Sequence, residues 1–379
     1  MKALVTGGAG FIGSHIADAL LGRGYEVRAL DNLEPRVHPR GCPAYLDGRM
    51  QLLKGDMRDH AAMESALDGV DVVFHMADYQ GNGTDYAKFF HSNVVGTALL
   101  FEIIGAKRLP VRKVVIASSQ AVYGEGQYYC ATHGLVLPDA RPAEQLDRAE
   151  WEIKCAECHG ALVAVLLREG RTNPASPYGI SKLAEENAAF HLGKLLGIPV
   201  VALRYSNVEG PRQSSYNGAS GICGSFTQAL QEGKPFAMLE DGKQLRDYVH
   251  VSDAVEASLL AMEDARADGQ VFNVGTGRGI TVVDFVRVLT QKTKAQISPE
   301  ISGTYRLGDA RHAISSVARL QGLGWKPKKG LGEIFDDYVE WLASVIGLRD
   351  SAAAGAGSPL EALEDHGVEE KHPAEVPAI

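Results

Sequence analysis

Three glycines, each three residues after the last, stand between an apolar stretch and a helical one near the start of the chain. They are Gly7, Gly10 and Gly13. Residues 2–6 are mostly apolar, as in a buried strand, and residues 14–23 place apolar side chains at helical spacing. Glycine at these positions lets the backbone approach a pyrophosphate at the N-terminus of the helix. The pattern therefore predicts a dinucleotide-binding unit.

Carboxylates determine which dinucleotide this unit is expected to bind. A second apolar stretch, residues 26–30, ends directly before Asp31. A carboxylate in this place can accept hydrogen bonds from both hydroxyls of a ribose, and it repels the 2′-phosphate of NADP. The next strand, residues 52–54, leads to Asp56, which could meet the adenine amino group. We therefore expect NAD as the cofactor.

Strands and helices continue to alternate along the first half of the chain. Further apolar strands are predicted at residues 70–75, 113–117 and 200–205. This alternation predicts an α/β protein with a Rossmann-type, doubly wound parallel sheet, whose ligand cleft lies at the carboxyl ends of the strands. We assign the sheet to residues 1–205. A smaller, mixed α/β substrate lobe is expected mainly in residues 206–346, where the short stretch 271–275 is one of its elements. Residues 347–379 are rich in Ala, Gly, Pro and Glu and are predicted to be disordered.

Tyr178 and Lys182 lie four residues apart, on one face of a predicted helix. A phenol with a pKa near ~10 is a poor base at neutral pH, but a neighbouring positive charge favours the phenolate. We expect Lys182 and an oxidised nicotinamide to lower the pKa of Tyr178, so that Tyr178 acts as the catalytic base. The pattern also arises by chance in many helices, and its weight comes from the glycine loop and from Ser119 before it.

Two short Cys/His pairs interrupt the alternating pattern between residues 125 and 176. Each pair has two intervening residues, the spacing of a tetrahedral zinc site. The expected ligands are Cys130, His133, Cys155 and Cys158, with His159 as a substitute for His133. A structural zinc would hold together an insertion that is too short to build its own core. The alternative is a set of buried or incidental thiols, and a catalytic zinc is disfavoured because four protein ligands leave no open position.

The overall charge and hydropathy exclude other classes of partner. The chain has 379 residues and a net charge of −9, which argues against nucleic acid because phosphate binding requires clustered Lys and Arg. No uninterrupted apolar run reaches the ~20 residues of a membrane span, and the N-terminus passes directly into the glycine loop without a signal pattern. We therefore expect a cytoplasmic protein with neither nucleic acid nor a membrane as its partner.

Taken together, the motifs resemble the extended short-chain dehydrogenase/reductase family that acts on nucleotide sugars. The resemblance extends over residues 1 to about 345 and includes the segments 203–207 and 248–253. It implies that Tyr178 is the base and acid, Lys182 its electrostatic partner and Ser119 the hydrogen-bond donor to the reacting oxygen. The expected cofactor contacts are Gly7, Gly10, Phe11, Ile12, Gly13, Asp31, Asn32, Asp56, Met57, Met76, Ala77, Asn93, Ser118, Tyr178, Lys182 and Tyr205. The expected contacts to a nucleotide-sugar substrate are Ser119, Gln120, Asn207, Arg212, Arg246, Arg306 and Asp309.

Within this family the chain is most similar to the dTDP-L-rhamnose 4-epimerase group, which interconverts dTDP-L-rhamnose and dTDP-6-deoxy-L-talose. The similar segments are 74–80, 117–126, 203–206, 210–214 and the Cys/His insertion. The resemblance implies NAD-dependent epimerisation at carbon 4 through a 4-keto sugar, with NAD regenerated in each cycle. It also implies a homodimer formed through two helices of the first domain. The chain departs from the group's pattern at Met76 and Asp78, where the group has alanines, and at Asn207, where it has an apolar residue.

Several other activities are compatible with parts of the pattern. A UDP-hexose 4-epimerase and a decarboxylase of uronic acids stay open. A 4,6-dehydratase requires an Asp-Glu pair after the serine, where this chain has Gln120 and Ala121, which cannot exchange protons. A reductase would release a reduced cofactor, and Asp31 disfavours the phosphorylated one. A non-enzymatic NAD-sensing or scaffold protein commonly loses the Tyr or the Lys, and both are present.

Overall fold

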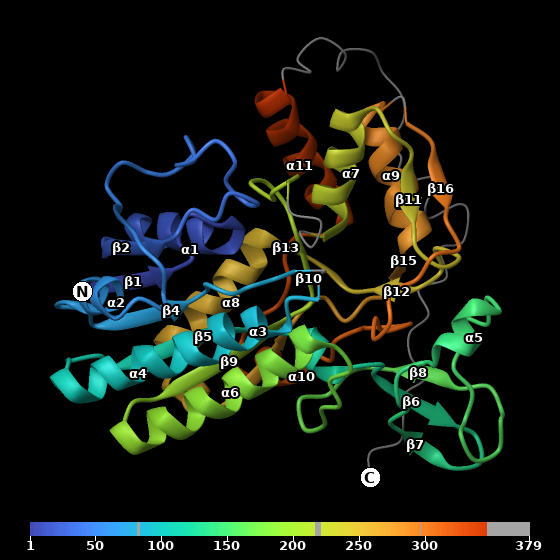
Figure 1. The fold of residues 1–379 in the computed structure, drawn as a ribbon, viewed down its shortest axis with the longest axis horizontal. Helices are drawn as coiled ribbons and strands as arrows, with labels where there is room; N and C mark the ends of the chain where they lie inside the picture. Colours follow the sequence, from blue (N-terminus) through green and yellow to red (C-terminus); the bar gives the residue numbers. More distant parts are fainter. Residues whose placement is uncertain (82–83, 217–220, 296, 347–379) are drawn as a thin grey trace.

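A seven-stranded sheet is the largest element of the computed structural model, which describes residues 1–346 apart from 82–83, 217–220 and 296 (Figure 1). Along the sheet the strands are ordered β14-β9-β5-β4-β1-β2-β3, and each neighbouring pair is parallel. Their bounds are β1 (Lys2–Thr6), β2 (Glu26–Asp31), β3 (Gln51–Lys54), β4 (Val72–His75), β5 (Lys113–Ser119), β9 (Val200–Tyr205) and β14 (Val271–Val274). This confirms the doubly wound α/β fold. The predicted disordered tail lies outside the described residues.

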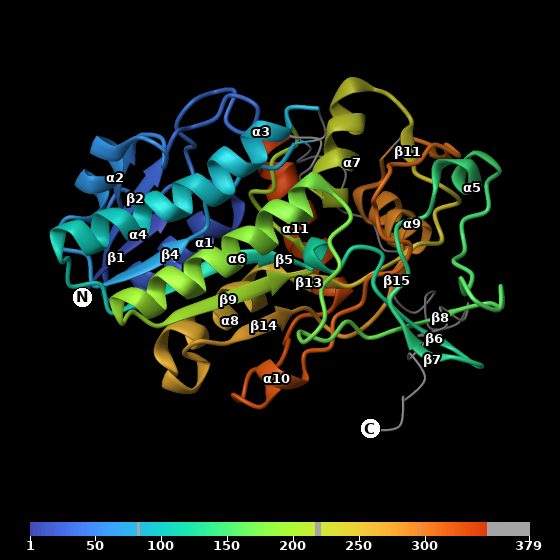
Figure 2. The ribbon, with the colours of Figure 1, turned by 60° about the horizontal axis from the view of Figure 1, so that its bottom comes forward.

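The interior strand β1 explains why the sheet is covered on both faces. Ala3 and Val5 point to one face and Leu4 to the other, because side chains alternate along a strand. All three are fully buried. The first face is covered by α1 (Phe11–Gly22) and α8 (Val251–Glu263), and the second by α2 (His60–Leu67), α4 (Gly96–Lys107) and α6 (Pro177–Leu196), as Figures 1 and 2 show. The loops that build a site therefore emerge at the sheet's edge.

The strand β14 belongs to the large sheet, whereas the sequence analysis assigned it to the second lobe. Phe272 pairs with Leu203 of β9 in parallel register. The chain therefore returns to the dinucleotide-binding sheet before it completes the second lobe. The local pattern could not show this, because apolar and β-branched residues suit a buried strand in either unit, and the partner strand is set by tertiary packing.

The second lobe has a separate core of aromatic side chains. Its elements are β10 (Asn207–Glu209), α7 (Gly221–Glu232), β11 (Phe236–Met238), β12 (Leu245–Arg246), β13 (Tyr248–His250), β15 (Ile280–Thr281), α9 (Val282–Thr293), β16 (Pro299–Ile301) and α11 (Leu331–Ile346). The ring of Phe285 lies 4.1 Å from that of Tyr248 and 4.8 Å from that of Phe335, measured between centroids. Burial of each such ring contributes about 2 kcal/mol relative to exposure. This core holds the lobe opposite the edge of the sheet.

The Cys/His insertion forms a small antiparallel sheet of its own. It consists of β6 (Gln127–Cys130), β7 (Gly134–Val136), α5 (Ala143–Asp147) and β8 (Val163–Val165), with β6 in the middle of the sheet. Arg141 lies 3.2 Å from Glu125 and 2.8 Å from Glu240 of the second lobe. Arg311 pairs with the same Glu240 at 2.9 Å, and all four side chains are buried. These ion pairs fix the insertion against the second lobe.

Residues 86–107 form a helical stretch that is long and apolar enough to cross a membrane by length and composition alone. It consists of α3 (Tyr86–Phe89), the π-helix η1 (Phe90–Val95) and α4. The sequence analysis found no uninterrupted apolar run here because Lys88 and Glu102 divide it. Leu100 and Ile103 of this stretch are buried against the sheet, and a core helix of a folded domain has the same composition. The remaining short helices are η2 (Gln120–Tyr123), η3 (Ala265–Ala267) and α10 (Ala318–Gln321).

Candidate active site

A cavity of about 1740 Å³ lies between the carboxyl edge of the large sheet and the second lobe. It brings together nearly all of the residues expected to contact a cofactor or a substrate. These are Gly7, Gly10, Phe11, Ile12, Gly13, Asp31, Asn32, Asp56, Met57, Met76, Ala77, Ser118, Ser119, Gln120, Tyr178, Tyr205, Asn207, Arg212, Arg246, Arg306 and Asp309. Two expected residues, Asn93 and Lys182, lie behind the wall and are buried.

The glycine loop before α1 has room for backbone only. Gly7 has a φ of +66°, and a Cβ there would lie 2.8 Å from the backbone of Ala77. A Cβ on Gly13 would lie 2.2 Å from the carbonyl oxygen of Gly7. No side chain caps the first turn of α1, whose N-cap is Gly10, so that the N–H groups of the turn are left for a ligand. This arrangement fits the pyrophosphate of a dinucleotide.

Two carboxylates lie at the ends of neighbouring strands in the same cavity. Asp31 accepts hydrogen bonds from the backbone N–H of Ala9 at 3.0 Å and of Leu33 at 2.8 Å, which fixes its side chain. Asp56 accepts from the guanidinium of Arg58 at 2.7 Å, and this hydrogen bond lowers the pKa of Asp56 to about 2. Fixed acceptors in this position suit the hydroxyl and amino groups of an adenosine.

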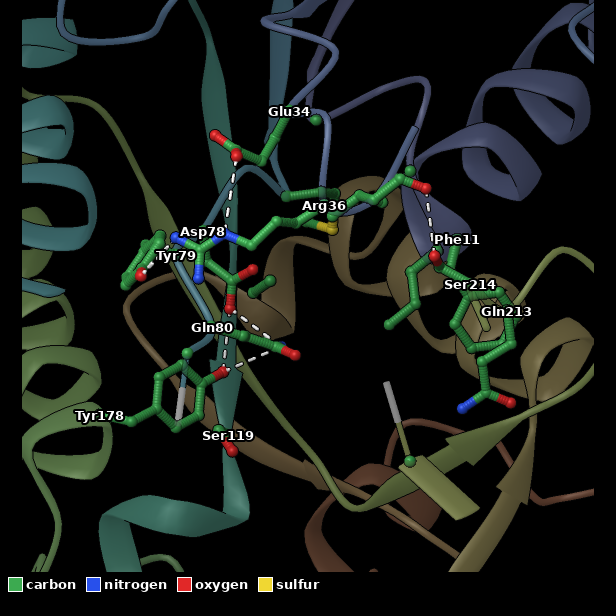
Figure 3. A pocket seen from close by; sticks show the side chains of 18 of the residues that line it. Phe11, Glu34, Arg36, Asp78, Tyr79, Gln80, Ser119, Tyr178, Gln213 and Ser214 are labelled. Carbon is green, nitrogen blue, oxygen red and sulfur yellow. Dashed lines mark hydrogen bonds and ion pairs between the residues drawn. The ribbon is translucent and has the colours of Figure 1, made fainter. Parts of the chain in front are cut away.

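Tyr178 donates a hydrogen bond to a carboxylate. Its Oη lies 2.9 Å from Oδ2 of Asp78, and Nε2 of Gln80 lies 3.1 Å from the same oxygen and 3.3 Å from the phenol (Figure 3). Burial, and after it the charge of Asp78, raises the pKa of Tyr178 well above its ordinary value of 10.0. Among the side chains described, burial and Asp78 thus outweigh the lowering expected from Lys182.

Lys182 is paired with a glutamate on its own helix. Its Nζ lies 2.6 Å from Oε2 of Glu185, and each side chain is 1% exposed. Although burial opposes its charge, the neighbouring carboxylates of Glu185 and Asp78 raise the pKa of Lys182. Burial raises the pKa of Glu185 to about 8. Among the described residues, Nζ has no hydrogen-bond partner beyond this ion pair, so it keeps donors that suit a ribose hydroxyl.

The two serines at the end of β5 have different surroundings. Ser119 accepts a hydrogen bond from the backbone N–H of Ala121 at 3.1 Å and so caps η2. Its hydroxyl can therefore still donate to a ligand in the cavity. Ser118 donates to Glu186, which also pairs with Arg204 at 2.7 Å inside the protein. Ser118 therefore positions the strand end, and Ser119 is the one suited to meet a reacting oxygen.

A side-chain pair joins the two lobes across the cavity. Nε2 of Gln120 donates to Oδ1 of Asn207, and Oε1 of Gln120 is buried without a partner among the described residues. Deeper in the cavity, the phenol of Tyr205 lies 2.7 Å from Oγ of Ser258 and 4.0 Å from the sulfur of Met76. The carboxamides of Gln120 and Asn207 are hydrogen-bonding groups for a sugar, and neither can take a proton from carbon.

The arginines expected to contact a nucleotide differ in how many of their hydrogen-bond donors are already used within the protein. Arg246 donates to three main-chain carbonyl oxygens. Arg212 pairs with Asp18 of α1 at 2.7 Å, beside the glycine loop. Arg306 is exposed at the rim of the cavity. Burial raises the pKa of Asp309, against the opposing charges of Arg246 and Arg306. Arg306 therefore has the donors most available to a diphosphate.

The loop after β4 contains residues whose importance the sequence analysis missed. Asn93, expected at the cofactor, accepts from the N–H of Tyr79 at 2.7 Å and donates to Ser181 at 2.9 Å, so it positions this loop against α6. Asp78 and Gln80 were not among the expected site residues. A carboxylate placed three residues after a strand, at the carboxyl edge of a parallel sheet, was the available signal.

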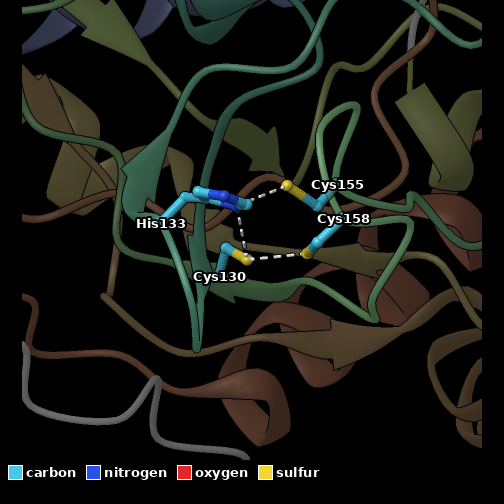
Figure 4. A group of neighbouring side chains, drawn as sticks. All are labelled: Cys130, His133, Cys155 and Cys158. Carbon is cyan, nitrogen blue, oxygen red and sulfur yellow. Dashed lines mark hydrogen bonds between the residues drawn. The ribbon is translucent and has the colours of Figure 1, made fainter.

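The four expected zinc ligands come together in the insertion (Figure 4). The ligand atoms of Cys130, His133, Cys155 and Cys158 all lie within 4.8 Å of one another. Nδ1 of His133 lies 3.3 Å from Sγ of Cys155, and the sulfurs of Cys130 and Cys158 are 3.6 Å apart. A tetrahedral zinc with bonds of about 2.1–2.3 Å needs ligand atoms roughly 3.4–3.8 Å apart. The substitute ligand, His159, lies outside this cluster.

Comparison with known proteins matches this geometry to one family. The profile of the NAD dependent epimerase/dehydratase family matches residues 3–138 and 164–275. The unmatched residues between these two segments lie within the Cys/His insertion. A dTDP-L-rhamnose 4-epimerase of Burkholderia thailandensis is 32% identical over 354 residues, which are 91% of this chain and 96% of that protein.

Solved structures of epimerases have the same fold. The UDP-glucose 4-epimerase of Thermotoga maritima with UDP-glucose is 31% identical with a TM-score of 0.72, covering 91% of this chain and 100% of that one. The UDP-glucose 4-epimerase of Thermus thermophilus in complex with NAD is 29% identical with a TM-score of 0.71 and the same coverage. The first of these structures thus contains a sugar nucleotide, and the second contains the cofactor NAD.

Proposed function

The chain belongs to the NAD dependent epimerase/dehydratase family, and on this basis we propose that it epimerises carbon 4 of a nucleotide-activated 6-deoxyhexose. The proposed reaction converts dTDP-L-rhamnose to dTDP-6-deoxy-L-talose. One observation carries the proposal: Ser119 and Tyr178 line the same cavity as the glycine loop. The similarity to the Burkholderia enzyme supports the choice of sugar.

NAD fits the residues at one end of the cavity. The glycine loop would hold its pyrophosphate, Asp31 its adenosine ribose, and Lys182 its second ribose. Bound NAD would supply the acceptor, and afterwards the donor, for the hydride of carbon 4. The fit rests on the close approach at Gly7 and on the uncapped N-terminus of α1.

The protein's own side chains perform the proton chemistry. Ser119 donates to the oxygen on carbon 4 and holds it beside Tyr178. Tyr178 exchanges a proton with that oxygen, removing it when the sugar is oxidised and returning it afterwards. Gln120 and Ala121 stand where a dehydratase needs an acid and a base, and the amide of Gln120 is engaged by Asn207. Dehydration is therefore disfavoured.

Zinc in the insertion is part of the proposal. Three thiol groups and one imidazole within 4.8 Å form a donor set that suits tetrahedral zinc. With four protein ligands such an ion would be structural. It would hold β6, β7 and the segment before β8 together in a unit that has little apolar core of its own.

A UDP-hexose is the second candidate substrate. The observation that favours it is the similarity to the Thermotoga enzyme, which is nearly as high as that to the Burkholderia one. A cytoplasmic location and a homodimer stay predictions. Exposed apolar side chains on and beside α4 and α6 support the homodimer: Val95, Ile180, Leu195 and Leu196.

The test is an NMR assay of sugar nucleotides with purified protein and no added cofactor. The expected result is that dTDP-L-rhamnose yields its carbon 4 epimer, while UDP-glucose is converted more slowly. Rapid conversion of UDP-glucose alone would replace the proposed sugar by the second candidate. Conversion of neither would contradict the proposed function.

A further inference from the structure

The carboxylate of Asp78 accepts the hydrogen bond of the reacting phenol, at 2.9 Å. The two side chains come from different elements, since Asp78 follows β4 and Tyr178 begins α6, and both line the cavity. Gln80 donates to the same carboxylate oxygen at 3.1 Å. The same carboxylate oxygen therefore accepts from both side chains. Figure 3 shows the three groups facing one another in the cavity.

Burial and the neighbouring carboxylates favour the protonated form of Tyr178. The titratable groups that face Tyr178 and its neighbour Lys182 come from β4, the loop after it and α6: His75, Asp78, Glu185 and Glu186. Lys182 lies 2.6 Å from Glu185 on its own helix. Burial and Asp78 both raise the pKa of Tyr178. A phenol in this state needs an acceptor for its own proton before it can take another.

We propose that Asp78 is that acceptor, so that Tyr178 acts as a proton relay between the sugar and the carboxylate. Asp78 acts through Tyr178, so it is a positioning residue. The inference rests on the proposed function, because it concerns the proton of the hydroxyl on carbon 4.

Two protons and one hydride move in the oxidative half of the reaction. The hydroxyl of the sugar gives its proton to Oη of Tyr178, and Tyr178 gives its own proton to Oδ2 of Asp78. Two O–H bonds break and two form. The hydrogen on carbon 4 leaves with both electrons of its bond to the nicotinamide cofactor, and a carbonyl remains. The reverse transfers restore all groups when the sugar is reduced.

The partial exposure of Asp78 fits this role. Tyr178 and Asp78 are both half-buried, and Gln80 is exposed. A carboxylate in contact with both the phenol and the solvent side can hold a proton during turnover without leaving an unpaired charge in the interior.

The first test is a titration of Tyr178 in the purified protein, followed by near-ultraviolet absorbance of the phenolate, with Tyr178→Phe as the blank. In Asp78→Asn the phenolate should appear at least about one pH unit lower than in the wild type, because a negative neighbour has been removed. This readout needs no substrate, so it tests Asp78 even if the proposed sugar is wrong. An unchanged titration would overturn the proposal.

The second test is the pH profile of kcat for the same variants. Asp78→Asn should lower kcat at neutral pH by about 10²-fold, and its rate should rise with pH as Tyr178 ionises by itself. Asp78→Glu should recover most of the rate. Asp85→Asn is the matched control, because Asp85 accepts a hydrogen bond from Tyr79, another tyrosine near the cavity, and does not contact Tyr178. If Asp78→Asn does not fold, Asp78→Ala takes its place.

A purely structural role would give a different result. It would lower kcat without moving the pH profile, and that outcome would overturn the relay. Wild-type kcat in Asp78→Asn would overturn it as well.

Discussion

The ammonium of Lys182 lies 2.6 Å from the carboxylate of Glu185, one turn further along the same helix, and each side chain is 1% exposed. A buried charge without a partner costs several kcal/mol, so each group depends on the other. Burial and the carboxylates of Asp78 and Glu185 raise the pKa of Tyr178. The Tyr-x-x-x-Lys spacing therefore does not by itself predict the net direction of the pKa shift of Tyr178.

Replacing Glu185 with Gln should reduce the pH dependence of stability. Burial raises the pKa of Glu185 to about 8 from an ordinary 4.5. The unfolded chain releases this proton at a lower pH, so the contribution to folding is full below about 4.5 and is lost as the pH rises through about 8. Denaturant unfolding at several pH values measures the slope. Glu102→Gln, at an exposed position on α4, is the control. An unchanged slope in Glu185→Gln would contradict the assignment.

Replacing Tyr178 with Phe should abolish turnover and leave the cofactor bound. The phenol oxygen alone carries the proton, and loss of a general base costs about 10²–10⁴-fold in rate. Turnover is measured by sugar-nucleotide NMR and bound NAD by release from denatured protein. Tyr305→Phe, which loses a hydrogen bond to Asp147 outside the cavity, is the control. Near-normal turnover in Tyr178→Phe would show that another group is the base.

Protein purified without added nucleotide should carry NAD, and Asp31→Ala should weaken the preference for NAD over NADP. The loss of charged hydrogen bonds to a ribose costs about 1.5–3 kcal/mol, which corresponds to roughly 10–100-fold in affinity. Titration with both cofactors measures the ratio. Asp47→Ala, a carboxylate bound to Arg49 outside the cavity, should leave the ratio unchanged. Recovery of NADP from the wild type would refute the argument from Asp31.

Protein prepared without a histidine tag should contain about one zinc per chain, because the four donors match a tetrahedral site. Cys155→Ser should lose the metal, while Cys42→Ser, which alters a free thiol elsewhere, should keep it. Elemental analysis is the measurement. Zinc below about a tenth of an equivalent per chain would contradict the proposal.

Removal of the metal should raise the KM for the sugar nucleotide more than it weakens NAD binding. The reason is that Arg141 joins the insertion to Glu240 in the second lobe, on the substrate side of the cavity. Equal losses for both ligands would indicate general unfolding and not a local effect.

The sequence predicted those features that depend on local pattern. The glycine loop, the strand before it and the helix after it lie within about twenty residues, so one short segment determines their geometry. The zinc ligands were also predictable in pairs, because two intervening residues in a tight turn bring both ligands of a pair together. That the pairs meet each other required the structure, where β6 joins β7 and β8.

Contacts between segments that are distant in the chain could not be predicted from the sequence. Asp78 and Tyr178 are 100 residues apart, and nothing in either segment indicates the other. The direction of the pKa shift of Tyr178 followed from that contact and from burial. The sequence does show Glu185 three residues after Lys182. The energetic effect of such a pair depends on whether it is exposed or buried, and the sequence does not show the burial.

The position of β14 has a consequence for truncated forms of this protein. A fragment that stops after Tyr205 would leave one side of β9 without its neighbour, since Phe272 and Val274 come from much later in the chain. That strand would present unpaired N–H and C=O groups and an apolar face, a surface that invites aggregation. The two lobes are therefore interdependent in synthesis as well as in architecture. The nascent chain cannot complete its first sheet until the segment around residue 274 has left the ribosome.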